Sequence, residues 1–545
     1  GVDLIHSGRV VPVYHENSKI NSKWLREKIQ PLLYLTNMIE DPLPEEIKSD
    51  NKLMTLGEAV NQVHFPDSQE DLLKARKRLG FDEMFAIQLG VLNRKLEFQQ
   101  DTQEVSKLVE VDYDLIEEFK SKLPFKLTSA QLRTIKEILQ DISSPRIMNR
   151  LLEGDVGAGK TLVACICLLV VIKSGYQGVF MAPTEILAKQ HYKNLIKTLQ
   201  PFGINIQLLT GSLTKKQKQL VASGLATKTV DLVVGTHAVI QAGIEFANLG
   251  LAVVDEQHRF GVNQRSVFKK FGQPHMLSMT ATPIPRTLAL TLYGDQELSI
   301  LDEKPIGRSP IITRCVPGSK RKEAYLWVED QLSKGRQAFV VCPLIDPSEA
   351  IAAKSVVEEY ERLRDVVFPN RRVGLVHGRL KQDQKDDMML QFKNHELDIL
   401  VATTVIEVGI DIPNASIMVI EACERFGLAQ LHQLRGRVGR GVHQSYCFLF
   451  PETSSQTTRK RMQAMVQYDD GFKLSEIDLE LRGPGEVYGV RQSGIPDLKM
   501  ASLADTKLVK AAAKAAEYVM QHYAGTRDHA RIVQNYQVSI SEIDY

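Results

Sequence analysis

Residues 154 to 161 read GDVGAGKT, which has the spacing Gly-x-x-x-x-Gly-Lys-Thr. Glycines at this spacing let backbone N–H groups curve around the β- and γ-phosphates of a nucleotide, while Lys160 adds a positive charge and Thr161 can hold Mg²⁺. The loop follows a strand-like stretch, NRLLE, and precedes a helix-like apolar stretch, TLVACICLLVVI, which argues against a chance match. The candidate nucleotide-binding residues of the loop are Gly154, Asp155, Val156, Gly157, Ala158, Gly159, Lys160 and Thr161.

A pair of acids ends another apolar run, LAVVDEQHRFG, and would complete such a site. We expect Asp255 to hold the water shell of the Mg²⁺ and Glu256 to orient or deprotonate the attacking water. A solvated acidic turn at a strand end is the alternative, and the phosphate loop argues against it. His258 could be a metal ligand or a general base, but a histidine beside two acids more often forms hydrogen bonds, so coupling is the better interpretation.

Three arginines lie on a short glycine-spaced segment, QLHQLRGRVGRG, at residues 430–441. Arg437 and Arg440 are candidate arginine fingers, which stabilise charge on the γ-phosphate and raise hydrolysis rates by about 10³–10⁵-fold. If they come from a different domain than the phosphate loop, hydrolysis indicates that the two domains have closed around the nucleotide. The competing interpretation is an arginine-rich patch that holds nucleic-acid phosphates, and it could apply to Arg435 alone.

Short apolar runs alternate with longer amphipathic stretches from about residue 120 onward, as expected for parallel strands joined by crossover helices. The candidate strands fall into two sets, which predicts two α/β domains. The first set is residues 178–182, 231–235, 251–255 and 276–280, and the second is residues 338–342, 373–377, 398–402 and 416–420. Between the sets, LDEKPIGRSP at residues 301–310 is a candidate hinge because its prolines and glycine break both periodicities.

The regions that flank these two domains have helical patterns. Residues 20–120 carry apolar side chains at helical spacing and are expected to be mostly helical. After about residue 452 the chain is helix-rich, with one glycine-studded segment, LRGPGEVYGVRQSG, at residues 481–494. With 545 residues, the chain has room for about three domains.

Charge and hydropathy exclude several classes of protein. Lys plus Arg total 68 and Asp plus Glu 66, so any nucleic-acid contact must use a local basic track. The longest apolar run, residues 162–172, is shorter than the ~20 residues that cross a bilayer, so no membrane segment is expected. Six scattered cysteines without zinc-ligand spacing favour a reducing, cytoplasmic setting. The first residues, GVDLIHSGRVV, contain no secretion signal and no initiator Met, so the chain could be a fragment.

The ordered motifs of superfamily 2 helicases are similar to GDVGAGKT, APTEILAKQH, DEQHRFG, TATPIPRT, ATTVIEVGIDIPNA and QLHQLRGRVGR in this chain. With DEQHRFGV and the downstream LRGPGEVYGVRQSG, the chain resembles the RecG family of bacterial branched-DNA translocases from about Ile5 onward. The resemblance implies an α/β fold of two RecA-like P-loop domains in tandem, with ATP and Mg²⁺ as cofactors. The implied domains are a wedge remnant at 1–19, a helical linker at 20–120, RecA-like domains at 121–305 and 306–453, and a helical hairpin with a translocation motif at 454–545.

The resemblance also implies roles for further residues. Gln131 matches an adenine-reading glutamine, which favours ATP over GTP, and Gly409 and Asp411 match positions that approach the nucleotide. Thr280 and Thr282 match a motif that links hydrolysis to domain movement, although an ordinary polar turn is the alternative. The matching DNA-backbone positions are Pro183, Thr184, Thr236, His237, Thr403 and Thr404. The tail positions expected to carry coupling or strand contact are Arg461, Arg482, Arg491 and Gln492. For the tail, the alternative is solvated arginines on a tight surface loop.

Taken together, the resemblance and the motifs predict an ATP-dependent DNA helicase that remodels stalled forks and Holliday junctions in recombination and repair, in the bacterial cytoplasm at the nucleoid. One alternative is a duplex translocase that removes DNA-bound proteins, as in the Mfd family, which reads DEEQRFG where this chain reads DEQHRFG. Another is a nucleotide-gated DNA clamp. The expected partners are branched and duplex DNA, with no membrane. A motor with its arginines in cis can act as a monomer, and a contact with single-strand-binding protein is left open. His6 to Glu16, HSGRVVPVYHE, resembles the last strand of the family's wedge barrel, so fork specificity depends on the wedge.

Overall fold

The chain forms two units in the computed structural model. The motor unit comprises residues 99–285 and 296–481, and the helical unit comprises residues 1–98, 286–295 and 482–545. The structure describes residues 10–14, 16, 20–101, 107–241, 243–256, 268, 270–283, 285, 289, 294, 296–303, 310–343, 349–403, 412–453, 455–482, 498–503 and 505–537. The candidate hinge at 301–310 therefore lies mostly outside the described residues.

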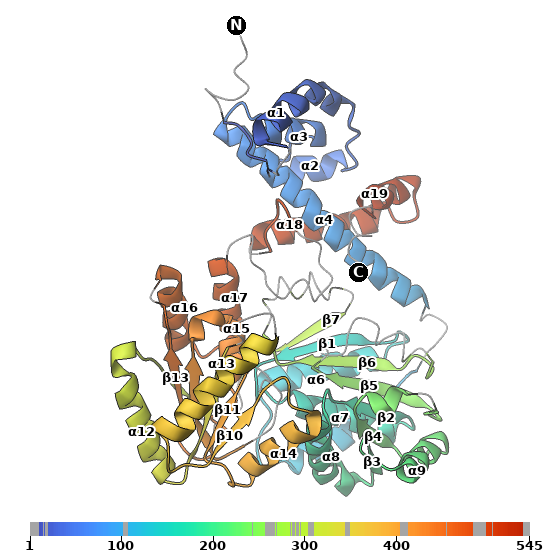
Figure 1. Cartoon of the computed structure of the whole chain (residues 1–545). Helices are drawn as coiled ribbons and strands as arrows, with labels where there is room; N and C mark the ends of the chain where they lie inside the picture. Colours follow the sequence, from blue (N-terminus) through green and yellow to red (C-terminus); the bar gives the residue numbers. More distant parts are fainter. Residues whose placement is uncertain are drawn as a thin grey trace. The chain divides into compact units, whose positions relative to one another are not determined.

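The first lobe of the motor unit is built on a parallel sheet with the strand order β3-β4-β2-β5-β6-β1-β7 (Figure 1). Its strands are β1 (Asn149–Gly154), β2 (Gln177–Met181), β3 (Ile206–Leu209), β4 (Leu232–Gly235), β5 (Leu249–Asp255), β6 (His275–Thr280) and β7 (Glu297–Leu301). One face packs on α5 (Tyr113–Ser121), α6 (Ser129–Ile142), α7 (Lys160–Lys173) and α8 (Glu185–Leu199). The other packs on α9 (Lys215–Ala226) and the 3-10 turn η3 (His237–Ile240).

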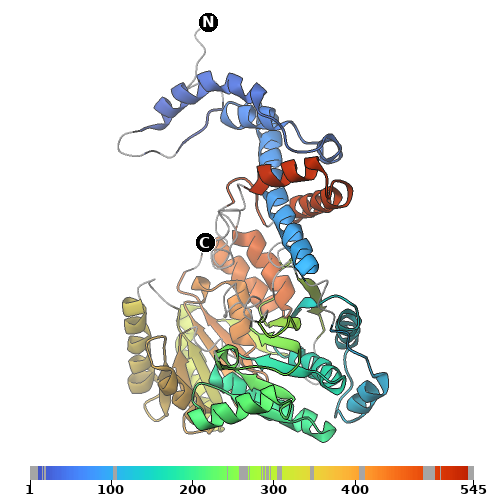
Figure 2. The same ribbon diagram turned by 90° about the vertical axis from the view of Figure 1, so that its right-hand side faces the viewer.

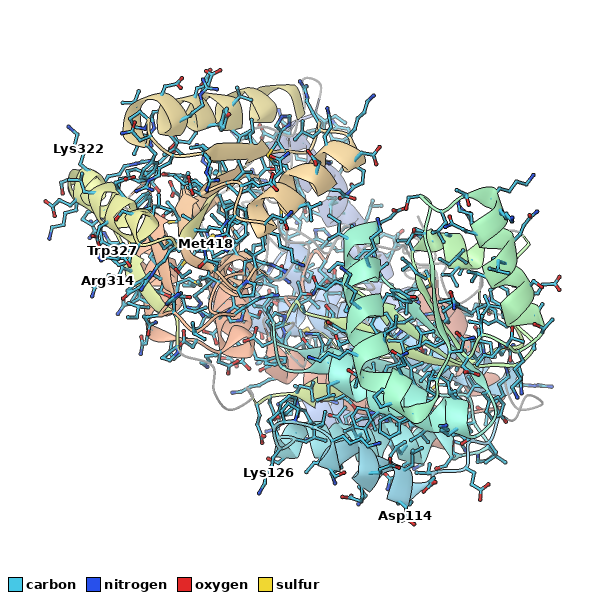
Figure 3. All side chains as sticks on the ribbon, turned by 90° about the horizontal axis from the view of Figure 1, so that it is seen from below. Asp114, Lys126, Arg314, Lys322, Trp327 and Met418 are labelled. Atoms are coloured by element: carbon cyan, nitrogen blue, oxygen red, sulfur yellow. The ribbon has the colours of Figure 1, made fainter. Side chains whose placement is uncertain are left out.

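The second lobe repeats this plan on a parallel sheet with the order β10-β11-β9-β12-β13-β8. Its strands are β8 (Ile312–Cys315), β9 (Gln337–Val341), β10 (Val373–Val376), β11 (Ile399–Ala402), β12 (Ala415–Glu421) and β13 (Tyr446–Phe450). Helices α12 (Arg321–Ser333) and α13 (Glu349–Arg362) cover one face, and α14 (Gln382–Lys393), α15 (Leu428–Arg435), α16 (Gln456–Gln467) and α17 (Gly471–Arg482) cover the other. Figure 3 shows Trp327 on α12, where its ring meets Tyr446 and Phe448 edge to face, and Met418 within the sheet.

These two sheets confirm the prediction of two parallel α/β domains in tandem, because every predicted apolar run overlaps one of the strands. The sheets are buried on both faces, as all-parallel sheets require, which explains why their strands read as continuous apolar runs rather than alternating ones. Among the described residues, every helix is too short or too polar to cross a bilayer.

The helical unit is organised around a long helix, α4 (Gln69–Asp101). Its other elements are α1 (Ser22–Ile29), η1 (Gln30–Met38), α2 (Glu45–Asn51), α3 (Leu56–His64), α18 (Thr506–His522) and α19 (Arg527–Gln537). Helices α18 and α19 lie beside α4 in both views (Figures 1 and 2). The buried Arg78 of α4 forms ion pairs with Asp41 at 2.7 Å and Asp82 at 3.0 Å, and Tyr536 of α19 donates to Asp82 at 3.0 Å. The Tyr536 bond holds α19 to α4, and the Arg78–Asp41 pair holds the segment before α2 to the same helix.

The stretch expected to be the last strand of a wedge barrel, residues 6–16, is only partly described, and residues 10–14 and 16 form no strand. The backbone N–H of Tyr14 donates to the hydroxyl of Ser22 at 3.0 Å, and its phenol contacts Nδ1 of His64 at 2.7 Å. That N–H therefore bonds to a side chain, and the resemblance of residues 6–16 to a barrel strand stays a prediction.

His275, at the start of β6, is a fully buried histidine whose two ring nitrogens both bond to backbone groups. Its Nδ1 accepts from the N–H of Met148 at 3.0 Å, and its Nε2 lies 2.8 Å from the carbonyl oxygen of Lys107, so the ring is neutral with its proton on Nε2. Burial lowers the pKa of His275 to about 4. A second proton, on Nδ1, would face the N–H of Met148.

Acidification is therefore expected to destabilise the motor unit through His275. The unfolded chain binds this proton near pH 6.5 and the folded chain near pH 4, so the free energy of unfolding should fall by about 3 kcal/mol between those values. Urea unfolding across this pH range should show a flatter dependence for His275→Gln than for the unaltered chain. Equal slopes for the two proteins would contradict this role.

Candidate functional site

The sequence-predicted residues of the first lobe gather along one edge of its sheet, at the carboxyl ends of the parallel strands. The phosphate loop follows β1, the acid pair ends β5, and Thr280 ends β6. These strands are neighbours in the order β5-β6-β1, whereas the expected DNA-backbone residues follow β2 and β4 on the other half of the edge. Ligands of open parallel sheets bind at this edge, so the topology separates a nucleotide half from a DNA half.

The phosphate loop combines two glycines in the left-handed region with a buried lysine ammonium. Gly157 and Gly159 adopt left-handed backbone angles with φ of 82° and 90°, which side chains with a Cβ rarely adopt. The ammonium of Lys160 donates to the carbonyl oxygens of Gly154 at 2.6 Å and Asp155 at 3.1 Å. Burial lowers the pKa of Lys160, and the nearby acids oppose this effect. The ammonium therefore lies against the carbonyl oxygens of the loop at the start of α7, where we expect the phosphates to bind.

Gln131 on α6 lies directly against this loop and is almost fully buried. Its Nε2 donates to the carbonyl oxygen of Ala158 at 2.9 Å, and its Oε1 accepts from the N–H of Thr128 at 3.0 Å. A Cβ on Gly159 would approach the same Nε2 at 2.3 Å. The amide is thus next to the nucleotide position, and reading an adenine would require it to exchange one of these two bonds. Its role in base recognition stays a prediction.

The acid pair after β5 is held in a defined orientation. One carboxylate oxygen of Asp255 lies 3.0 Å from Nε2 of His191, and the other accepts from the N–H of Glu256 at 3.1 Å. Glu256 has φ of 52°, a left-handed angle that costs a residue with a side chain about 1–3 kcal/mol and is typical of functional sites. Carboxylate and hydroxyl oxygens suit Mg²⁺, so Asp255 and Thr161 fit the expected metal role.

Two further expected residues, Thr280 and Thr282, are joined after β6. Their hydroxyls lie 2.6 Å apart, and the hydroxyl of Thr280 also accepts from the N–H of Thr282 at 3.2 Å. The pair forms a tight polar turn, which is compatible with both the coupling role and the plain turn considered from the sequence. His258, Gly409 and Asp411 lie outside the described residues.

The second lobe reaches the phosphate loop through α15. Nε2 of His432 lies 2.6 Å from a carboxylate oxygen of Asp155, and both side chains are buried. At the end of the helix, a Cβ on Gly436 would stand 3.2 Å from the Cβ of Val156. Arg437 is the next residue, and Arg440 follows one turn later, with its Nε 3.4 Å from the carbonyl oxygen of Gly436. Both candidate fingers therefore belong to a segment packed on the phosphate loop.

Arg435 does not face solvent, which argues against the alternative that this residue holds nucleic-acid phosphates. It is 2% exposed, and its guanidinium donates to the carbonyl oxygens of Met465 at 2.7 Å and Tyr468 at 2.9 Å. The same group lies 3.0 Å from Nδ1 of His432. Because His432 accepts from Arg435 at Nδ1, its Nε2 carries the proton that Asp155 accepts.

Replacing Arg435 with methionine should destabilise the second lobe by about 3 kcal/mol, because two buried carbonyl groups lose their donor. Differential scanning calorimetry should show a lower unfolding temperature than for the unaltered chain. The exposed Arg425 offers a control, and Arg425→Met should leave that temperature within about 1 °C. An unchanged unfolding temperature for Arg435→Met would show that the buried bonds contribute little.

Helix α17 touches both lobes at its first turns. A Cβ on its first residue, Gly471, would meet Cγ of Pro283 at 2.4 Å and Nε2 of His432 at 2.7 Å. The hydroxyl of Ser475 donates to the carbonyl oxygen of Pro283 at 2.5 Å. Residues from the Thr280–Pro283 turn, from α15 and from α17 therefore form one contact. Sequence reasoning missed His432 and Ser475, because their partners lie 277 and 192 residues away.

The expected DNA-backbone residues lie in loops of both lobes. Thr184 accepts from the N–H of Leu187 at 3.4 Å and begins α8, and His237 is exposed after β4. Thr403 follows β11, and its buried hydroxyl has no hydrogen-bond partner among the described residues.

The guanidinium of Arg461 donates to the carbonyl oxygens of Glu424, at 2.9 Å, and Phe426, which favours coupling over strand contact. Pro183 and Thr236 are half-buried. Thr404, Arg491, Gln492 and the side chain of Arg482 lie outside the described residues.

The two lobes also share a loop that has no counterpart among the sequence-predicted sites. After β3, in GSLTKKQK (211–218), the last lysine, Lys218, donates to the carbonyl oxygen of Gly211 at 2.7 Å. After β10, in GRLKQDQK (378–385), the last lysine, Lys385, donates to the carbonyl oxygen of Gly378 at 2.9 Å. In each loop a glutamine side chain accepts from the N–H of the N-cap residue just before the helix, at 3.0 and 3.1 Å. Both loops follow the edge strand of their sheet, and the repeated spacing Gly-x-Leu-x-x-x-Gln-Lys is visible in the sequence.

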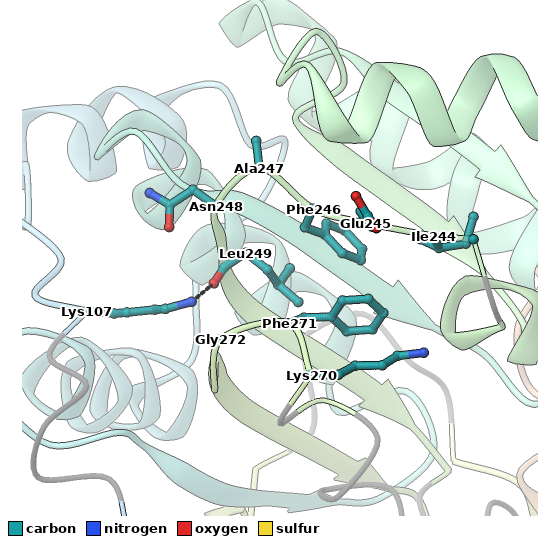
Figure 4. Close-up of a pocket in the computed structure, with 11 residues that line it drawn as sticks. Lys107, Ile244, Glu245, Phe246, Ala247, Asn248, Leu249, Lys270, Phe271 and Gly272 are labelled. Carbon is teal, nitrogen blue, oxygen red and sulfur yellow. Dashed lines mark hydrogen bonds between the residues drawn. The ribbon is translucent and has the colours of Figure 1, made fainter.

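A pocket of about 800 Å³ lies at the opposite edge of the first lobe, at the amino-terminal ends of β5 and β6. Figure 4 shows the rings of Phe246 and Phe271 lining it, with the ammonium of Lys107 bonded to the carbonyl oxygen of Leu249. Burial lowers the pKa of Lys107 to about 8. None of the sequence-predicted residues lines this pocket, so it is separate from the nucleotide and DNA edge.

Comparison with known proteins gives matches along most of the chain. The family model for DEAD/DEAH box helicases matches residues 128–291, the helicase conserved C-terminal domain matches 322–442, and the C-terminal part of domain 3 of ATP-dependent DNA helicase RecG matches 468–537. An ATP-dependent DNA helicase RecG from Synechocystis is 46% identical over 98% of this chain and 65% of the relative. Another from Staphylococcus aureus is 44% identical over 95% of this chain and 76% of the relative.

A solved structure, of RecG bound to a three-way DNA junction, matches with a TM-score of 0.77 and 43% identity over 92% of this chain and 66% of the other. The tandem sheets, the phosphate loop and the α15 segment packed on it define a superfamily 2 helicase motor. The chain belongs to the RecG family of ATP-dependent DNA helicases. It spans 65% of the length of its Synechocystis relative.

Proposed function

We propose that this chain is an ATP-driven motor that moves on duplex DNA and remodels branched DNA, such as stalled forks and Holliday junctions, in recombination and repair. The observation that carries the proposal is the contact of both lobes with one phosphate loop, through His432 to Asp155 and Gly436 to Val156. Hydrolysis at a site made by two lobes depends on how those lobes are placed. The same site can therefore convert hydrolysis into movement.

The position of each site residue supports a role in one step of ATP hydrolysis. Lys160 binds the phosphates, Glu256 orients or deprotonates the attacking water, and Arg437 and Arg440 stabilise charge that develops on the γ-phosphate. Mg²⁺, held by Thr161 and Asp255, would neutralise charge on the phosphate oxygens. Gln131 would favour adenine over guanine. Once the γ-phosphate has left, Arg437 and Arg440 lose their partner, and the lobes are released.

The path from this site to DNA runs through α15 and α17. The guanidinium of Arg435 bonds both to His432 and to the carbonyl oxygens of Met465, in the last turn of α16, and Tyr468, which follows that helix. Ser475 of α17 bonds to Pro283, next to the Thr280–Thr282 pair. A change at the phosphate loop thus has a continuous hydrogen-bonded route to the hairpin α16–α17, and coupling is the role we propose for Thr280, Thr282 and Arg461.

The DNA track is proposed to run over the loops after β2, β3 and β4 of the first lobe and after β10 and β11 of the second. Hydroxyl and backbone groups hold phosphates without reading bases, which suits movement along any sequence. Pro183, Thr184, Thr236, His237 and Thr403 would make these contacts. The repeated loops at 211–218 and 378–385 add a lysine in each lobe, which supplies the local positive charge that the balanced overall composition requires.

The test is the steady-state rate of ATP hydrolysis without DNA, with linear duplex and with a three-way junction, using Lys160→Met as the blank. Stronger stimulation by the junction than by linear duplex is the expected result. Equal stimulation by both would instead indicate a duplex translocase of the kind that removes bound proteins. Hydrolysis that no DNA stimulates would indicate a nucleotide-gated clamp and contradict the proposal. Size-exclusion chromatography with light scattering should show that the active species is a monomer.

A further inference from the structure

The chain that follows the glycine-studded segment is fixed to α4 by one carboxylate. Glu83 accepts three consecutive backbone N–H groups, from Lys499 at 3.2 Å, Met500 at 3.0 Å and Ala501 at 2.8 Å. Consecutive N–H groups that converge on one anion form a strong and directional site, because each bond is assisted by the full negative charge. Glu83 thus acts as the anion of this site.

A second feature of α4 supports the same contact, one turn before Glu83. A Cβ on Gly80 would stand 3.3 Å from the carbonyl oxygen of Met500 and 3.4 Å from Cα of Ala501, so the helix and the incoming chain touch backbone to backbone. Ala501 and Leu503 are both 2% exposed. Residues 499–503 are therefore seated on α4 by three independent means: a carboxylate, a close backbone approach and burial of apolar side chains.

The place of this contact in the chain gives it a consequence. Helix α17 ends at Arg482, and the segment 483–497, which lies outside the described residues, joins that helix to the anchored residues 499–501. The hairpin α16–α17 is the end of the route from the phosphate loop. A displacement of the hairpin therefore acts on the segment 483–497, and Glu83 holds the residues that follow the carboxy-terminal end of that segment.

We propose that Glu83 is a positioning residue for the motor. It fixes the carboxy-terminal end of the 483–497 segment to α4, so movement of the hairpin is transmitted to α4 instead of being lost in a slack chain. This inference rests on the proposed function. It assigns to α4 a mechanical role that neither the nucleotide residues nor the DNA loops provide.

The experiment compares Glu83→Ala, Glu83→Gln and Gly80→Ala with the unaltered chain in two measurements. The matched control is Glu97→Ala, which removes the same charge from an exposed position on the same helix. Hydrogen–deuterium exchange of residues 499–501, without DNA, reads the anchor directly. The number of ATP molecules hydrolysed per three-way junction remodelled reads the transmission.

Exchange at 499–501 is expected to accelerate at least about tenfold in Glu83→Ala, less in Glu83→Gln, and not at all in Glu97→Ala, since loss of the carboxylate leaves three N–H groups open to water. Junction-stimulated hydrolysis should stay within about twofold, while the ATP consumed per junction should rise several-fold in Glu83→Ala and Gly80→Ala. Gly80→Ala keeps the carboxylate and crowds the chain, because its Cβ would stand 3.3 Å from the carbonyl oxygen of Met500, so it tests the anchor even if Glu83→Ala folds poorly.

Two results would overturn the inference. Unchanged exchange in both Glu83→Ala and Gly80→Ala would show that the anchor does not exist. Faster exchange with an unchanged ratio of ATP to remodelled junctions would show that the anchor only supports the fold. If the unaltered chain itself fails to remodel junctions, the proposed function fails and the positioning role falls with it, whereas the exchange data still decide the anchor.

Discussion

Arg437→Ala is expected to lower kcat for DNA-stimulated ATP hydrolysis by about 10³-fold or more, because an arginine finger stabilises charge that develops only in the transition state. The residue follows Gly436, which packs on Val156 of the phosphate loop, so we expect the second lobe to bring its guanidinium to the nucleotide. KM for ATP should change by less than about tenfold, since a contact made mainly in the transition state adds little to ground-state binding. Steady-state kinetics with saturating junction DNA would measure both constants.

Arg425→Ala provides the control for Arg437→Ala, because Arg425 is an exposed arginine of the same lobe with only a distant ion pair, 3.6 Å from Glu452. It should leave kcat and KM unchanged. A rise in KM for ATP without a fall in kcat for Arg437→Ala would contradict the finger role. Such a result would indicate that Arg437 binds ATP in the ground state only.

Lys160→Met is expected to lower kcat/KM for ATP by about 10²–10³-fold, the loss typical of removing one charged donor from a developing anion. Its ammonium is held by the carbonyl oxygens of Gly154 and Asp155, at the place where the phosphates are expected. Methionine keeps most of the side-chain volume, so the fold of the loop should survive. The same kinetic assay would measure the effect, together with the affinity for a fluorescent ATP analogue.

Lys173→Met is the matched control for Lys160→Met, since Lys173 ends the same helix α7 and is exposed. It should hydrolyse ATP at the rate of the unaltered chain. Hydrolysis by Lys160→Met at more than about a tenth of that rate would show that the ammonium is not needed for phosphate binding. The assignment of this loop as the catalytic nucleotide site would then be wrong.

Much of the fold could be predicted from the sequence because buried parallel strands read as uninterrupted apolar runs. Strands β7 and β8 were missed, since they lie at sheet edges and leave part of their side chains exposed. Strand β3 is short and also lies at an edge. Strand β13, YCFLF, was not among the predicted strands, although it is an apolar run like the others.

The phosphate loop and the acid pair could be found from the sequence because their chemistry is set by residues close together in the chain. The position of Arg435 could not, because its carbonyl partners and its burial depend on the turn between α16 and α17. The same limit applies to His432, whose partner Asp155 lies in the other lobe. Contacts between lobes leave no local spacing, so coupling residues escape a motif search that finds catalytic ones.

The measurement that tests the central claim most directly is the remodelling of a labelled three-way DNA junction, followed by gel electrophoresis, with ATP, with a non-hydrolysable ATP analogue and with no nucleotide. Rearranged strands should form with ATP alone, and Arg437→Ala and Lys160→Met should form none. Equal rearrangement with the analogue would show that binding, not hydrolysis, drives the reaction. A chain that hydrolyses ATP on the junction but never rearranges it would contradict the account of a motor that remodels branched DNA.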